Sequence, residues 1–175
     1  YYLIRKGPMA QSPCHAGAFI RSDEGLGTPD IQLMFNPYSR EGTGFSESPG
    51  ISIVGYLMYP KSSGELLVRS AEPGTAPLIA PKYLDEEYDR KASVAAVRHI
   101  RDIAARPPLA SRLTGEMPSS AAAQSDEEIV ALYRKGGMPG FHAVGTCAMG
   151  NDAGSAVVDG NARVHGVDGV RVVDC

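Results

Sequence analysis

The chain has 175 residues, of which 43% are hydrophobic and 21% are charged, and its net charge is −3. This composition is typical of a globular domain with a core, and the charge gives no electrostatic reason to expect nucleic-acid binding. No apolar stretch is long enough for a membrane span, and the N-terminal residues lack the apolar segment of a signal peptide. We therefore expect neither nucleic acid nor a membrane as a partner.

The cysteines and histidines favour a reduced setting without a metal. An odd number of cysteines with no close pair argues against a disulfide framework or a zinc site, which favours the cytoplasm: Cys14, Cys147 and Cys175. The four histidines show no metal-ligand spacing, so no metal is expected. Because the chain does not begin with Met, we expect it to be part of a longer protein.

The first third of the chain predicts short strands separated by loops. Apolar or alternating runs at residues 18–21, 31–35 and 51–59 predict the strands, and the Gly-, Ser- and Pro-rich stretch 36–50 predicts a loop. In 51–59 both alternating sets of residues are largely apolar. We therefore expect this run to be a central strand that is covered on both faces.

The middle of the chain predicts a turn at 60–64 and a further strand at 65–69. The stretch 71–81 contains three prolines, so it is expected to have no regular structure. A helix is predicted over 86–105, because apolar residues recur at three-residue steps before two prolines end the pattern: Val94, Val97, Ile100 and Ile103.

A second helix is predicted to begin at Ser125. Glu128 lies three positions further on, which is the spacing of a capping box, and Gly136 and Gly137 mark the end of the helix. Its apolar face is expected to contain Ile129, Leu132 and Tyr133. The final segment is Gly-rich over 138–150, and Val-rich runs at 156–159 and 170–174 predict two short strands. Several strands followed by helices predict an α+β fold.

His142 is the residue that offers chemistry, because a histidine can exchange a proton near neutral pH. A lone histidine is also often a hydrogen-bonded structural residue, so the surrounding pattern matters. The sequence FHAVGTCAMG, followed by AVVDGNARVHGVDGVRVVDC, resembles the C-terminal signature of GMC (glucose–methanol–choline) oxidoreductases. The upstream sequences RKGPMAQSP and PKSSGELLVR resemble other parts of the same family.

The resemblance implies a two-part architecture. Family members combine a Rossmann-type FAD domain, opened by a GxGxxG motif, with a substrate domain in which helices back an antiparallel β-sheet. Residues 1–137 resemble the substrate-binding domain, 138–175 the catalytic segment that returns to the FAD domain, and 61–175 the family's C-terminal domain. The chain contains no GxGxxG motif. We therefore expect FAD in the full-length parent protein but not bound to this chain alone.

The resemblance also implies roles for individual residues. His142 matches the catalytic histidine that acts as a general base during hydride transfer to flavin N5, and Phe141 beside it is a candidate substrate contact. Asp174 and Cys175 match the residues placed against the flavin. Arg163 and Val164 match a pair close to the flavin in family oxidases, although Arg163 is equally readable as a solvated residue.

The function implied is that of an FAD-dependent alcohol dehydrogenase or oxidase that acts on the CH–OH group of a small alcohol and resembles choline dehydrogenase. Its partners would be the alcohol and the rest of the parent chain, which includes the FAD domain. The family's second catalytic residue, a His or Asn, would lie beyond Cys175, so this chain alone is expected to be inactive. Two alternatives stay open: a substrate-binding module without catalysis, and a hydroxynitrile lyase on the same scaffold. A hydrolase using Cys147 or a serine with His142 is disfavoured because no GxSxG motif is present.

Overall fold

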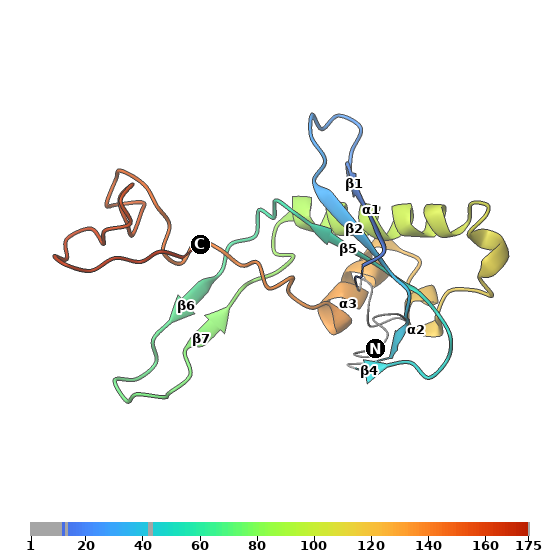
Figure 1. The fold of residues 1–175 in the computed structure, drawn as a ribbon, viewed down its shortest axis with the longest axis horizontal. Coiled ribbons are helices and arrows are strands. Elements are labelled where there is room, and N and C mark those ends of the chain that lie inside the picture. The colour runs from blue at the N-terminus through green and yellow to red at the C-terminus, as the bar shows by residue number, and fades with distance from the viewer. Residues whose placement is uncertain (1–11, 13, 42–43, 175) are drawn as a thin grey trace, which may run out of the picture. The chain divides into compact units, whose positions relative to one another are not determined.

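The computed structural model describes residues 12, 14–41 and 44–174, and its contacts divide the chain into two compact units (Figure 1). The first unit combines Tyr1–Ser63 with Tyr83–Gly137, and the second combines Gly64–Lys82 with Met138–Cys175. Contacts therefore group Gly64–Lys82, which lies inside the predicted 1–137 domain, with the C-terminal segment. Within the described residues, no helix is both long and apolar enough to cross a bilayer.

An antiparallel sheet organises the first unit. It contains β1 (Ala16–Ile20), β2 (Ile31–Asn36) and β5 (Ser52–Leu57), in the order β1-β2-β5. All three expected strands are therefore found. In the register, Ile31 lies opposite Ile20 on one side and Leu57 on the other, so these three apolar residues share one face.

The predicted central position of 51–59 is wrong. In the described sheet β2 lies in the centre and β5 pairs with β2 alone. Only one face of β5 is covered, and Val54 on the other face is 41% exposed. The second face includes Tyr56, whose hydroxyl donates to Gln32 Oε1 at 2.5 Å. The run 51–59 is apolar on both faces, but β5 is not buried on both faces.

The predicted loop at 36–50 contains a small hairpin. Strands β3 (Arg40–Glu41) and β4 (Gly44–Phe45) pair antiparallel, and the ring of Tyr38 meets Phe45 edge to face at 5.1 Å. Two-residue strands are too short to produce a readable alternation, which is why the sequence pattern missed them.

Helix α1 (Glu87–Ala104) packs against the sheet and also against helix α3 (Asp126–Gly136); the three elements are labelled in Figure 1. Two apolar clusters result. The cluster toward the sheet contains Ile31, Leu33 and Ala96, and the cluster toward α3 contains Val94, Ala123, Ile129 and Val130. Small alanines on α1 allow this close approach. A Cβ atom at Gly55 would lie 3.3 Å from Ala96 Cβ and 3.2 Å from Ile100 Cδ1.

The capping box predicted for the second helix is confirmed. Ser125 Oγ accepts the backbone N–H of Glu128 at 3.2 Å, and the Glu128 carboxylate accepts the backbone N–H of Ser125 at 2.9 Å. Further along α3, the hydroxyl of Tyr133 donates to the backbone oxygen of Gly55 at 3.2 Å. This bond fastens the helix to the edge strand of the sheet.

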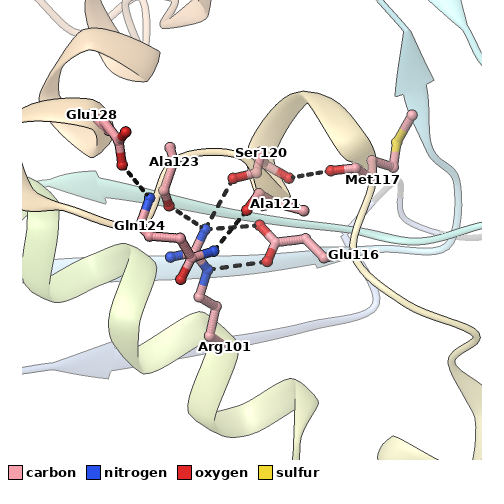
Figure 2. Close-up of polar contacts among 8 residues, drawn as sticks. All are labelled: Arg101, Glu116, Met117, Ser120, Ala121, Ala123, Gln124 and Glu128. Atoms are coloured by element: carbon pink, nitrogen blue, oxygen red, sulfur yellow. Dashed lines mark hydrogen bonds and ion pairs between the residues drawn. The ribbon is translucent and has the colours of Figure 1, made fainter.

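Between α1 and α3 lie a 3₁₀ turn (Ala110–Arg112) and the short helix α2 (Pro118–Ala121), neither of which the sequence pattern predicted. Arg101 holds this connection in place (Figure 2). Its guanidinium pairs with both carboxylate oxygens of Glu116, at 3.0 and 3.2 Å, and donates to the backbone oxygens of Ser120 and Ala123. The last two bonds satisfy carbonyls at the end of α2.

In the second unit, β6 (Glu65–Leu67) pairs antiparallel with β7 (Leu78–Ala80). The expectation that 71–81 has no regular structure is therefore wrong. The three residues of β7 fit between Pro77 and Pro81, so neither proline occupies a position in the ladder.

The two Val-rich strands predicted near the C-terminus are absent from the described residues. Isolated bridges replace them, such as those that pair Val158 with Met149 and with Val164. The Gly- and Asp-containing turns between the valines keep each pairing to a single residue.

Candidate active site

His142 lies in an irregular loop of the second unit. The residue before it, Phe141, has a φ of 57°, a left-handed conformation that is costly for a bulky side chain. The Phe141 side chain is 81% exposed, and His142 is exposed as well. Strained backbone at a non-glycine residue is enriched at functional sites, where it fixes the direction of a neighbouring side chain.

The imidazole of His142 makes no hydrogen bond within the described part of the chain, and Gly145 nearby has a φ of 108°. The interpretation of His142 as a hydrogen-bonded structural residue therefore finds no partner among the described groups. The residue as a whole is exposed. An accessible, unengaged imidazole can take up a proton from a bound molecule.

Downstream of His142, residues 148–172 form a frame of turns held mainly by backbone hydrogen bonds. Val158 is 2% exposed and lies at its centre. The Val158 oxygen accepts the N–H of Gly150 at 2.9 Å, and the Val157 oxygen accepts the N–H of His165 at 3.0 Å. This frame gives the loop that carries His142 a fixed point of attachment.

Two carboxylates cap turns of this frame. The backbone N–H groups of Arg163 and Asn161 donate to the Asp159 carboxylate, and these bonds lower the pKa of its carboxyl group. The Asp152 carboxylate accepts the N–H of Gly154 and the hydroxyl of Ser155, which also lowers its pKa. Both groups therefore stay ionised at neutral pH and act as structural anchors.

The other histidine of this segment has a different environment. His165 Nε2 lies 3.0 Å from the backbone oxygen of Gly150, and the side chain is half-buried. It joins two turns of the frame. The surroundings of the two histidines therefore differ. His142 is exposed, whereas His165 is hydrogen-bonded to the backbone.

The remaining residues implied by the resemblance are only partly brought together. Arg163 is exposed and lies opposite Arg171 in an isolated bridge, and Val164 is half-buried. Asp174 is exposed. Cys175 lies outside the described residues, so its predicted position beside a flavin stays a prediction.

The structure also orients the aromatic residues of the sheet. Phe35 shares the face of Ile31 and Leu33, toward α1, whereas Tyr56 lies on the opposite face with Gln32 and Val54. The left-handed backbone of Phe141 was not predicted, and a non-glycine residue in this conformation has no clear sequence signal.

The described strands pair antiparallel, and among the described residues no strand–turn–helix unit of the dinucleotide-binding type occurs. These residues therefore do not form a cradle for a pyrophosphate. Among the described residues, His142 and Asp174 stay the predicted neighbours of a flavin.

Comparison with known proteins identifies a family model described as GMC oxidoreductase, which matches residues 60–175. An alcohol dehydrogenase [acceptor] from Pseudomonas putida is 34% identical over 99% of this chain and 32% of its own length. An oxygen-dependent choline dehydrogenase from Proteus mirabilis is 37% identical over 94% of this chain and 30% of its own. The chain thus spans about a third of the length of the curated relatives it matches.

Solved structures are similar as well. A pyridoxine 4-oxidase from "Mesorbium loti" superposes with a TM-score of 0.75 and 27% identity, over 93% of this chain and 32% of that one. A formate oxidase from Aspergillus oryzae, whose description concerns FAD modification, superposes with a TM-score of 0.67 and 26% identity, over 85% of this chain and 27% of that one. The predicted arrangement of an antiparallel sheet backed by helices is confirmed.

Proposed function

The chain belongs to the GMC oxidoreductase family, and on that premise we propose that it forms the substrate-binding and C-terminal part of an FAD-dependent oxidoreductase acting on alcohols. The observation that carries this proposal is the accessible, unengaged His142 in the part of the chain that the family model matches. The first substrate class to test is the small alcohols, with choline among them, because two of its relatives are named for alcohol and choline oxidation.

The chain's own contribution to the reaction is the handling of a proton. An alcohol that becomes a carbonyl compound loses the hydroxyl proton and a hydride from the adjacent carbon. An unprotonated imidazole nitrogen of His142 would take the hydroxyl proton, and the developing alkoxide makes the carbon a better hydride donor. Bound FAD would supply the acceptor for that hydride.

Two further residues would assist. The exposed ring of Phe141 lies next to His142 in sequence and would contact the apolar part of the substrate. Asp174, and Cys175 after it, would lie against the flavin ring. The sharp backbone conformation of Phe141 would fix the direction in which His142 is presented.

A chimera tests this proposal. In the Pseudomonas putida alcohol dehydrogenase [acceptor], the matched third would be replaced by this chain, which preserves the relative's remaining residues. The purified chimera, loaded with FAD, would be mixed without oxygen with ethanol, butanol, benzyl alcohol or choline. We expect at least one alcohol to bleach the flavin absorbance near its visible maximum and to yield the aldehyde. A flavin-loaded chimera that no alcohol reduces would contradict the proposal.

A further inference from the structure

One face of the sheet in the first unit points away from α1. Its side chains alternate with those that pack on the helix, and Phe19 and Val54 on this face are 62% and 41% exposed. The register places the residues of this face in two rows across the three strands. We call these six residues the open face: Gly17, Met34 and Val54 in one row, and Phe19, Gln32 and Tyr56 in the other.

The composition of the open face is unusual for a surface in contact with water. An antiparallel sheet with one covered face commonly carries polar residues on the other face. Here Phe19, Met34, Val54 and Tyr56 provide apolar or aromatic surface, and Gln32 lies among them as the polar residue. Apolar surface around a few placed polar groups is typical of a site for a small molecule.

The amide of Gln32 is oriented by its neighbour in the row. The hydroxyl of Tyr56 donates to Gln32 Oε1 at 2.5 Å, and both side chains are half-buried. This bond engages the oxygen of the amide, so the Nε2 end, with its two N–H donors, is left for another partner. No described residue accepts a hydrogen bond from Gln32 Nε2. The open face therefore offers hydrogen-bond donors to a bound molecule.

The charge of the open face limits what it can bind. None of its six residues is Asp, Glu, Lys or Arg, so a bound cation would find no carboxylate on it. The rings of Phe19 and Tyr56, on either side of Gln32 in the row, could attract a quaternary ammonium group. The N–H groups between them oppose that attraction, because they turn the positive ends of their dipoles toward the cation. A neutral molecule with an apolar body and an oxygen acceptor fits the face better.

We propose that the open face selects neutral alcohols with an apolar body, and that Gln32 disfavours choline and similar cations. Gln32 Nε2 donates to an oxygen of the alcohol, while Phe19 and Val54 contact its apolar part. This inference rests on the proposed function, because it takes the molecule bound on this face to be the alcohol that is oxidised. It goes further by separating choline from the neutral alcohols as substrate classes.

A second copy of this chain fits the open face less well than a small molecule does. A stable protein–protein interface involves about 20–30 residues on each side, and the open face consists of six. Its apolar residues surround one half-buried amide whose donors need a partner. A single oxygen atom of a ligand meets that requirement.

A pair of substrates with the same shape gives the first test. In 3,3-dimethylbutan-1-ol, the carbon analogue of choline, a carbon atom replaces the quaternary nitrogen and the positive charge is lost. In the flavin-loaded chimera, kcat/KM for the carbon analogue should exceed that for choline by about a hundredfold or more. Equal values, or a preference for choline, would overturn the inference.

Exchanging the amide for a carboxylate gives the second test. Gln32→Glu keeps the size of the side chain and an acceptor for the Tyr56 hydroxyl, but it replaces the N–H donors with a negative charge. The preference of the chimera for the carbon analogue over choline should fall at least about tenfold. Gln124→Glu makes the same change at an exposed position outside the sheet and should leave the preference unchanged. A loss of stability would lower turnover of both substrates alike, so an unchanged preference in Gln32→Glu would overturn the inference.

Binding to the chain alone distinguishes this inference from the proposed function. The sequence contains three glutamines, so the side-chain amide signal that Gln32→Glu removes from the NMR spectrum of the isotope-labelled chain is that of Gln32. The carbon analogue should shift this signal, and choline at the same concentration should leave it in place. An unmoved signal with the carbon analogue, an equal shift with choline, or a dimer of the chain that Phe19→Lys dissociates would overturn the inference. A shifted signal together with a flavin-loaded chimera that oxidises no alcohol would support selective binding and contradict the proposed function alone.

Discussion

Ser62 and Asp89 hold the start of α1 from opposite sides. Asp89 Oδ2 accepts the backbone N–H of Ser62 at 2.8 Å, and Oδ1 accepts that of Lys61 at 2.7 Å. In return, Ser62 Oγ accepts the backbone N–H groups of Asp85 and Glu86. The segment after β5 and the first turn of the helix therefore satisfy each other's backbone donors, around a carboxylate that is 2% exposed.

Replacing Asp89 tests this reciprocal cap. Asp89→Ala should lower the free energy of unfolding by about 1–3 kcal/mol, because two partly buried N–H groups lose a charged acceptor. Asp89→Asn keeps the shape and one acceptor oxygen and should cost less. Urea denaturation of the chain and its two variants measures both values. Equal stability of all three proteins would show that the cap contributes nothing.

The pair of Asp30 and Tyr88 predicts a loss of stability in alkali. The Tyr88 hydroxyl donates to Asp30 Oδ2 at 2.7 Å, and burial together with this bond raises the pKa of Tyr88 to about 12. A raised pKa favours the protonated phenol in the folded state. Its stabilising contribution is complete below the ordinary value of 10.0 and is lost as the pH rises through about 12.

Melting temperatures measured between pH 8 and 12 check this prediction, with Tyr88→Phe as the comparison. The variant should be less stable at pH 8 and should lose less stability as the pH rises. Tyr133→Phe is a useful second variant, because burial also raises the pKa of Tyr133 to about 12. Parallel curves for the wild-type chain and Tyr88→Phe would refute the assignment.

The Asp30 carboxyl of the same pair predicts a loss of stability in acid. Burial alone would raise the pKa of the Asp30 carboxyl, but hydrogen bonds from Ser22 and Tyr88 together lower it below 3.8. The ionised form is therefore favoured by folding. Its contribution is complete above pH 3.8 and is lost as the pH falls through the lower folded value. Asp30→Asn should show a weaker acid dependence in urea denaturation between pH 5 and 2.5, and an unchanged dependence would exclude this role.

Arg101 contributes separately to stability by holding α2 in place (Figure 2). Arg101→Lys keeps the charge but cannot reach two carboxylate oxygens and two backbone oxygens with one planar group. We expect a loss of about 1–2 kcal/mol and faster amide exchange in Pro118–Ala121. Arg106→Lys is the control, because its pair with Asp102 is exposed. A variant with unchanged exchange in α2 would contradict the account.

Local chemistry made the helices α1 and α3 predictable, and tertiary surroundings decided the rest. Ser125 and Glu128 are three residues apart, so their hydrogen bonds depend on the helix that they begin. The edge position of β5 depends instead on the strand order β1-β2-β5 of the described sheet, and nothing in the run 51–59 encodes that order. The three-residue strand between Pro77 and Pro81 is ordered by pairing with Glu65–Leu67, a partner outside its own stretch.

The candidate site shows the same division. The position of His142 was predictable from the pattern around it, but its exposure and the left-handed backbone of Phe141 beside it were not. Sequence could not distinguish His142 from His165 by environment. The structure does so through the contact between His165 and Gly150.

Turnover of the chimera with His142 replaced by Ala tests the central claim most directly. Relative to the unsubstituted chimera, turnover with the best alcohol should fall by roughly 10²–10⁴-fold, the usual contribution of a positioned acid–base group, while flavin content and melting temperature stay unchanged. His165→Ala, the matched control, should lower the melting temperature and leave turnover within about tenfold. A His142→Ala chimera that melts earlier but keeps near-normal turnover would contradict the account.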